Sequence, residues 1–292
     1  KLASSAILTY TLDSTCYSVI GKQTEAINEL DKNDPEYYIK QGNTTEQYIA
    51  ENSIVKVYGS EAAEELIDHC FQIYGGYGFI EEYPMAQAYR DNRINKIWEG
   101  TNEINRMLCG RAMITKALSG EIGFKEYLEK VDVYCNNGLD SGYEGDLKTE
   151  VECVEAAKAV YAICLNESLS KHGQDIGTEQ VIIENLANIL IYAYVGDSTL
   201  SRVIQNKDLY VQKNQVVPEL CAKVYTAEQG IRVMEYANKI LNSIYDGEIP
   251  KELESKFAKL SKRLSLSTDT IGLKKIIGEK VVEAGGYPVQ SF

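Results

Sequence analysis

Apolar residues recur with a helical period along almost the whole chain, and residues that break helices are few. The 292 residues include only 22 Gly and 5 Pro, which leaves little room for the many tight turns of an all-β protein. Segments with apolar positions three and four residues apart favour amphipathic helices instead. The sequence therefore predicts an all-α protein, and its length is sufficient for two domains.

The charge of the chain excludes one broad class of partner. Acidic residues outnumber basic ones, and the formal net charge is −13 at pH 7. A nucleic-acid surface needs clustered Lys and Arg, and no such cluster stands out from the acidic background. Two histidines and seven cysteines without a CxxC pair give no ligand pattern for a metal ion. We expect neither nucleic acid nor metal as a partner.

The cysteines and the hydropathy indicate where such a protein resides. Most cysteines lie in apolar helical patterns, where a thiol packs as a small hydrophobe, and their odd number suits a reducing compartment. The sequence has no run of 18 apolar residues and so predicts no membrane span. We expect a soluble, cytoplasmic protein. Because a helical period is already under way in the first residues, we also expect the chain to begin in the middle of a longer protein.

Glycine, proline and threonine mark the ends of the helices expected in the first part of the chain. A helix is expected over residues 1–27, a polar connection over 31–45, and a long apolar helix from about 49 to 73. The glycines from Gly75 to Gly78 end that helix. Pro84 begins a short helix, and Thr101 caps another that stops at Gly120.

A loop-like composition over residues 138–146 separates this part from the remainder. We place a first helical domain at residues 1–120, a linker at 121–146 and a second helical domain at 147–292. In the second domain the apolar period predicts helices at roughly 147–172, 177–206, 215–244, 249–263 and 268–284.

Two segments of the first domain carry a recognisable motif. Residues 72–79 read Gln-Ile-Tyr-Gly-Gly-Tyr-Gly-Phe, and residues 98–101 read Trp-Glu-Gly-Thr. Together they resemble the signature of the acyl-CoA dehydrogenases, flavoenzymes that oxidise fatty acyl thioesters to 2-enoyl thioesters. The match is strongest over residues 47–118. The resemblance implies the C-terminal helical bundle of that family.

The length of the second part adds to this resemblance. The chain continues for over 170 residues beyond Leu118, whereas short- and medium-chain members of the family end near that position. Such a continuation is similar to that of the very-long-chain acyl-CoA dehydrogenases. The resemblance therefore implies a second helical bundle that extends the first.

Dehydrogenation of a thioester needs one positioned base and one cofactor. The base removes a proton from the α-carbon while a flavin takes a hydride from the β-carbon. A carboxylate suits the first task, because partial desolvation against the acyl chain and the flavin raises the pKa of such a group toward neutrality. The resemblance implies that Glu99 is this catalytic base and that Gly100 leaves room for the substrate thioester.

The resemblance also implies which residues bind the FAD cofactor. Thr101 and Glu103 match the pair that contacts the ribityl-pyrophosphate and adenosine portion, although many relatives carry Gln or Asp at the second position. A carboxylate there repels a diphosphate unless it reaches a hydroxyl or amino group instead. Gln72 and Gly76 match residues that hold the ADP portion of a partner subunit's FAD, which implies at least a homodimer. Arg111 is a further candidate for binding the coenzyme A substrate.

Three functions remain open at this point. The leading hypothesis is an FAD-dependent acyl-CoA dehydrogenase that passes electrons to an electron-transfer flavoprotein. An assembly or scaffold paralogue, whose helical extension binds a protein partner, is the alternative from another class. Glu99 favours the enzyme, because a scaffold has no use for a desolvated carboxylate. An acyl-CoA oxidase ranks lower, since its pattern around the base differs. The family's N-terminal and middle domains have no counterpart here, so we expect this chain alone to be inactive.

Overall fold

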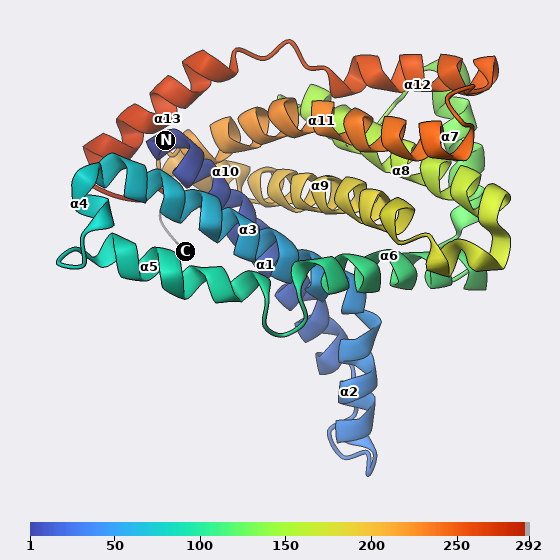
Figure 1. The fold of residues 1–292 in the computed structure, drawn as a ribbon, viewed down its shortest axis with the longest axis horizontal. Coiled ribbons are helices and arrows are strands. Elements are labelled where there is room, and N and C mark those ends of the chain that lie inside the picture. Colours follow the sequence, from blue (N-terminus) through green and yellow to red (C-terminus); the bar gives the residue numbers. More distant parts are fainter. Residues whose placement is uncertain (290–292) are drawn as a thin grey trace.

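The protein is built from helices throughout the part that the computed structural model describes, residues 1–289 (Figure 1). The first part of the chain forms α1 (Leu2–Asn28), α2 (Tyr37–Gln47), α3 (Ile49–Tyr74), α4 (Gly76–Phe79), α5 (Pro84–Arg93), the 3-10 turn η1 (Ile94–Lys96) and α6 (Asn102–Ser119). The remainder forms α7 (Phe124–Asn137), α8 (Lys148–His172), the 3-10 turn η2 (Gly173–Thr178), α9 (Gln180–Gln205), α10 (Lys207–Gln212), α11 (Val217–Ile244), α12 (Lys251–Leu264) and α13 (Thr270–Ala284). The predicted all-α fold class is confirmed. No helix in residues 1–289 is long and apolar enough to cross a bilayer.

Local signals end the helices where the sequence predicts. Gly75 closes α3 with a φ of +58°, a left-handed value that favours glycine. Pro84 occupies the first turn of α5, where its missing N–H costs no hydrogen bond. The Thr101 hydroxyl accepts a 3.3 Å hydrogen bond from the Ile104 N–H and caps α6, which Gly120 ends in the left-handed conformation.

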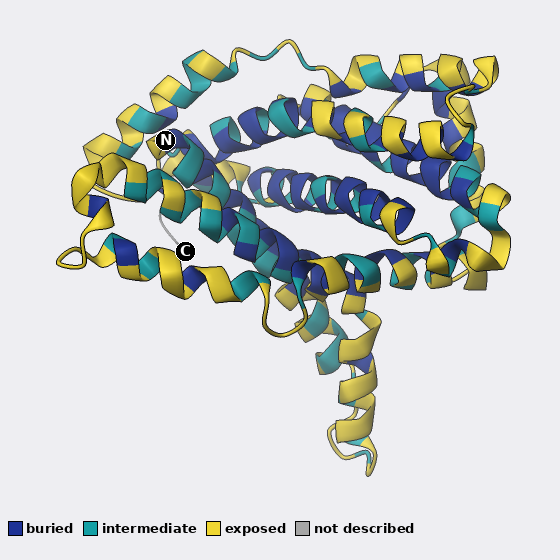
Figure 2. Ribbon diagram, viewed as in Figure 1, coloured by how far each residue is buried: buried dark blue, intermediate teal, exposed yellow. Residues whose placement is uncertain are grey.

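Besides the short α4 and α10, two longer helices occupy segments that the sequence predicts to be connections. The first, α2, lies within the polar stretch around residues 31–45, and only Thr44 of its side chains is buried. Helix α2 therefore has no apolar stripe, and the prediction of helices from the sequence depends on such stripes. Figures 1 and 2 show α2 projecting from the body of the molecule together with the adjoining end of α1, and most of this projection is exposed.

The second of these longer helices, α7, lies within the segment 121–146 that the sequence predicts to be a linker. Val131, Tyr134 and Cys135 are buried, and Phe124, Tyr127 and Leu128 pack against the same apolar cluster. These positions follow the three-and-four spacing of an amphipathic helix, so the signal was present in the sequence. The boundaries proposed for the two domains stay a prediction.

The two halves of the chain share their apolar core. Tyr10 of α1 and Ile54 of α3 belong to one buried cluster together with Val195 of α9 and Val224 of α11. Figure 2 shows α9 as a largely buried helix between the others. Each large aliphatic side chain that is withdrawn from water contributes roughly 1.5–3 kcal/mol. The second half therefore stabilises the helices of the first half by covering one face of them.

Gly110 allows α6 to lie close to α9. A Cβ atom at this position would lie 2.4 Å from Cγ2 of Ile183 and 3.2 Å from its carbonyl oxygen. Ile183 is fully buried and has little room to move away. The absence of a side chain at residue 110 thus sets the distance between the two halves at this point.

We expect Gly110→Ala to destabilise the protein by about 1–3 kcal/mol, because the added methyl group overpacks the contact between α6 and α9. Gly278→Ala is the matched control: no atom lies within 4 Å of its Cβ position in α13, so the better helix propensity of alanine should stabilise by about 1 kcal/mol. Urea unfolding followed by circular dichroism measures both. Equal stability of the two variants would contradict the close approach.

Candidate active site

The Glu99-Gly100-Thr101 element forms the connection between η1 and α6. Glu99 has a φ of +54° and Gly100 a φ of +78°, after which Thr101 turns extended as the cap of α6. The left-handed conformation costs a residue with a side chain about 1–2 kcal/mol. Such strain persists only where the surrounding contacts hold it, so the neighbours of this loop determine where Glu99 lies.

Two side chains hold the carbonyl groups of the loop. The Asn105 amide donates hydrogen bonds to the carbonyl oxygens of Gly100 (2.8 Å) and Thr101 (3.1 Å), and a longer one to that of Glu99 (3.4 Å). Lys56 Nζ, from α3, donates to the Gly100 oxygen at 2.6 Å. A Cβ on Gly100 would lie only 3.1 Å from the Asn105 amide nitrogen. The loop is therefore fixed from both α3 and α6.

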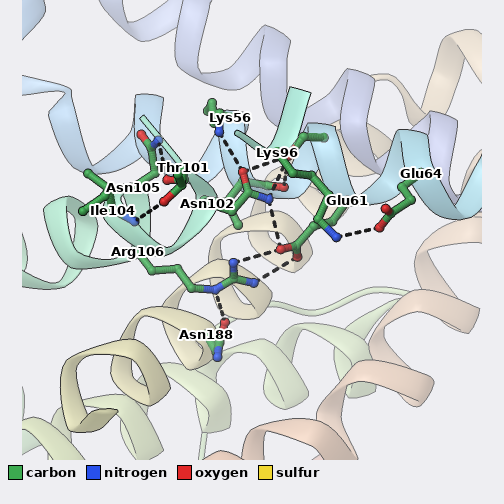
Figure 3. A network of polar contacts seen from close by, with 12 residues as sticks. Lys56, Glu61, Glu64, Lys96, Thr101, Asn102, Ile104, Asn105, Arg106 and Asn188 are labelled. Carbon is green, nitrogen blue, oxygen red and sulfur yellow. Dashed lines mark hydrogen bonds and ion pairs between the residues drawn. The ribbon is translucent and has the colours of Figure 1, made fainter. Parts of the chain in front are cut away.

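A polar network continues from Lys56 into the interior (Figure 3). Lys56 Nζ also donates to the side-chain oxygen of Asn102 (2.8 Å), whose residue is only 1% exposed. The Asn102 amide nitrogen donates to the hydroxyl of Ser60 (2.9 Å) and to Glu61 (3.1 Å). Asn102, the first residue of α6, is thereby connected to the middle of α3.

Arg106 connects this network to α9. Its two terminal nitrogens donate to the two carboxylate oxygens of Glu61 at 2.8 and 2.9 Å, and its Nε donates to the side-chain oxygen of Asn188 at 2.7 Å. Burial disfavours the charge on Arg106, but the hydrogen bonds and charge of Glu61 outweigh it and raise the pKa of the guanidinium. Arg106 thus joins α6 to both α3 and α9.

Two other charged groups beside the loop have shifted pKa values. Partial burial lowers the pKa of Lys56, against the opposing charges of Glu103 and Glu61. Hydrogen bonds from its own backbone N–H and from the Thr101 hydroxyl lower the pKa of Glu103. Glu103 is therefore firmly ionised at neutral pH, and its carboxylate acts only as a hydrogen-bond acceptor.

Glu99 is exposed on this chain, and apolar side chains that are also exposed flank it in the sequence. The indole of Trp98 is 57% exposed. The other exposed apolar residues of the loop and the start of α6 are Ile94, Ile97, Ile104 and Leu108. Large apolar groups in water around one carboxylate are typical of a surface that a ligand or another polypeptide covers.

The remaining candidate residues lie in two other places. Gln72 is exposed near the end of α3, and Gly76 begins α4 with open space where a side chain would stand. Gln72 follows Glu61 by eleven residues on α3, which corresponds to about 16 Å along the helix. The Arg111 guanidinium donates to the Gly177 carbonyl of η2 at 3.0 Å. The chain therefore brings Glu99, Gly100, Thr101 and Glu103 together, and holds Gln72 and Gly76 elsewhere.

Sequence reasoning missed the residues that support the loop. Lys56, Ser60 and Glu61 lie on α3, which was interpreted as a helix of the core alone. Asn188 was also overlooked, although it interrupts the apolar run Leu186-Ala187-Asn188-Ile189 and is 9% exposed. A polar residue inside such a run needs a hydrogen-bond partner, and this signal could have marked it.

Family models match both halves of the chain. A model described as the C-terminal domain of acyl-CoA dehydrogenase matches residues 2–114, and a second with the same description matches residues 156–256. A protein named probable acyl-CoA dehydrogenase from Bacillus subtilis is 28% identical over 290 residues, which cover 99% of this chain and 48% of the relative. The bovine mitochondrial very long-chain specific acyl-CoA dehydrogenase is 31% identical over 222 residues, which cover 69% of this chain and 31% of the relative.

Solved structures agree with these matches. The crystal structure of an acyl-CoA dehydrogenase from Bacillus anthracis, complexed with FAD, superimposes with a TM-score of 0.88 at 28% identity, and covers 98% of this chain and 48% of that one. An acyl-CoA oxidase from Yarrowia lipolytica has a TM-score of 0.60 at 17% identity and shows a likeness of fold alone. The two family models and the superposition identify the helical fold as that of acyl-CoA dehydrogenase C-terminal domains. This chain belongs to the acyl-CoA dehydrogenase family, and it spans less than half the length of these relatives.

The strain at Glu99 makes a prediction about stability. Glu99→Gly should raise the free energy of unfolding by up to about 1 kcal/mol, because relief of the left-handed strain exceeds the entropic cost of glycine. Glu103→Gly, in the first turn of α6, should lower it by about 1 kcal/mol. Denaturant unfolding of both variants tests the difference. A destabilised Glu99→Gly protein would show that Glu99 is not strained.

Proposed function

We propose that this chain is the C-terminal helical part of an FAD-dependent acyl-CoA dehydrogenase that converts a fatty acyl-CoA to the trans-2-enoyl-CoA, with Glu99 as the base. The observation that carries the proposal is the conformation of the Glu99 loop. A glutamate is kept in a strained left-handed conformation by Asn105 and Lys56, although a glycine would fit there without strain. Strain of this kind is concentrated at functional sites.

The proposed role of Glu99 is to take a proton from the α-carbon of the substrate. The loop holds the carboxylate in a fixed position. Correct positioning accelerates proton transfer more than a stronger base alone would. Trp98 and the exposed isoleucines beside it would exclude water from the carboxylate once substrate and the rest of the protein cover this face. Gly100 leaves space for the thioester beside the base. FAD, when bound, would accept the hydride from the β-carbon.

The residues beside the base are chemically suited to parts of FAD. Thr101 offers a hydroxyl, and the ionised Glu103 is an acceptor for a ribose hydroxyl or an amino group rather than for a phosphate. Gln72 offers an exposed amide, and the backbone at Gly76 is open because no atom lies within 4 Å of a Cβ built there. This set of donors and acceptors therefore suits a dinucleotide cofactor.

We further propose that two subunits share each cofactor. Gln72 lies about 16 Å along α3 from Glu61, the α3 residue that is connected to the start of α6. We assign Thr101 and Glu103 to the FAD of their own subunit, and Gln72 with Gly76 to the ADP portion of the FAD of the second subunit. Each cofactor would then be shared, and the active enzyme would be at least a homodimer.

The partners follow from the same proposal. Arg111 uses one N–H group on Gly177, which leaves other donors of its guanidinium for an anionic group of coenzyme A. An electron-transfer flavoprotein would reoxidise the reduced flavin. The fatty acyl chain and much of the flavin would be covered by a part of the protein that corresponds to the other half of the longer relatives.

Glu99→Gln tests the base directly. In a full-length protein that contains this chain, kcat with palmitoyl-CoA and a dye acceptor should fall by about 10²–10⁴, because the amide cannot accept the proton. Glu121→Gln, at an exposed position after α6, should leave kcat unchanged. Equal rates for Glu99→Gln and the wild type would remove Glu99 from the mechanism and favour the scaffold function.

Flavin content tests how the cofactor is shared. We expect the 292-residue chain by itself to purify with far less than one FAD per chain, because this half supplies only some of the contacts to the cofactor. Absorbance at the flavin bands after purification, with added FAD in a parallel sample, measures the occupancy. A stoichiometric yellow protein would contradict the expectation.

A further inference from the structure

Arg106 connects the helix that follows the catalytic loop to the second half of the chain. It lies on α6, and all of its hydrogen-bonded contacts cross to other helices: Glu61 on α3 and Asn188 on α9. The side chain of Arg106 is 14% exposed and Asn188 is 9% exposed. Figure 3 shows the guanidinium between these two partners. The Glu61 side chain is 36% exposed, so this end of the ion pair reaches solvent. Every contact of Arg106 is charge-assisted, and the planar guanidinium makes each one directional.

Direct hydrogen bonds connect this arginine to the loop. The Glu61 carboxylate that binds Arg106 also accepts from the Asn102 amide at 3.1 Å. The other end of that amide, the Asn102 oxygen, accepts from Lys56 Nζ at 2.8 Å, and the same ammonium donates to the Gly100 carbonyl at 2.6 Å. The connection therefore runs without a gap from α9 to the residue next to Glu99.

Loss of the hydrogen bond from Arg106 to Asn188 on α9 would displace the other side chains of this network. Without the Asn188 oxygen, the Nε–H of the partly buried Arg106 would lose its acceptor on the protein, and the loss of such a partner is costly. The guanidinium would turn toward another acceptor, and Glu61 would have to follow it or lose its paired geometry. Asn102 takes part of its alignment from Glu61, and Lys56 donates to Asn102, so the donor to the Gly100 carbonyl would be displaced in turn.

We propose that α9 positions the catalytic loop through Asn188, Arg106 and Glu61, which act as positioning residues and touch neither substrate nor cofactor. The second helical half would thus determine the geometry of the base in addition to covering the core. The conformational link stands on the contacts above, whereas its effect on catalysis rests on the proposed function of Glu99.

The sequence provides a reporter for the link. Trp98 is the only tryptophan of the chain and directly precedes Glu99, and it is exposed enough for a quencher to reach. In the 292-residue chain, Asn188→Ala should shift the emission maximum of Trp98 and change its quenching by acrylamide. Asn188→Asp keeps an acceptor oxygen for Arg106 and should retain the wild-type values.

Asn185→Ala is the matched control. Asn185 is a second buried amide on α9, but its amide nitrogen bonds to the Val181 carbonyl of its own helix at 2.7 Å. Its replacement should leave Trp98 unchanged even where stability falls. Should Asn188→Ala not fold, Arg106→Lys keeps the positive charge beside Glu61, loses the Nε contact to Asn188, and should change Trp98 in the same way.

Kinetics of the full-length enzyme measure the consequence for catalysis. Asn188→Ala should lower kcat by about 10- to 100-fold with little change in KM, because a displaced base loses its alignment with the α-proton while the substrate site is intact. Trp98 emission and quenching identical to wild type in folded Asn188→Ala or Arg106→Lys would overturn the link. A failure of the proposed function is distinguishable, since it would appear as full activity of Glu99→Gln while the Trp98 signal still reports on α9.

Discussion

The ion pair between Arg106 and Glu61 is the interaction on which the site depends. Two partly buried opposite charges are most stable together when their remaining hydrogen-bonding groups are also satisfied. Here Asn188 takes the third nitrogen of the guanidinium, and Asn102 donates to the carboxylate. The pair therefore requires α3, α6 and α9 to be in place at once, and it links the core of the protein to the loop that carries Glu99.

The polar network holds the strained backbone at Glu99 in place. Glu99 and Gly100 both have a positive φ, and the carbonyl groups of this loop are held by Asn105 and Lys56. Local sequence preferences would favour a relaxed connection, and functional sites are where such preferences are commonly overridden. The strained loop is stabilised by side chains of α3 and α6, whose own positions are set by packing in the core.

The second half of the chain is closely integrated with the first. Its central helix, α9, lies in a buried cluster with α1 and α3, and Gly110 lets α6 approach it to within side-chain contact of Ile183. A division into residues 1–120, 121–146 and 147–292 remains our proposal for the units of the chain. If the units are divided so, the interface between them is apolar and contains a partly buried ion pair, which favours a fixed rather than a mobile arrangement.

The sequence by itself determined the helical class, the ends of most helices and the motif around Glu99. These features depend on neighbours along the chain: Gly75, Pro84 and Thr101 act within one helical turn. It did not determine α2, which has almost no buried face, nor the partners of the loop. Arg106 and Asn188 are 82 residues apart, and a contact between distant residues leaves no local pattern. Only the packing of α3, α6 and α9 against one another decided which polar side chains meet, because a buried donor selects its partner by position in space.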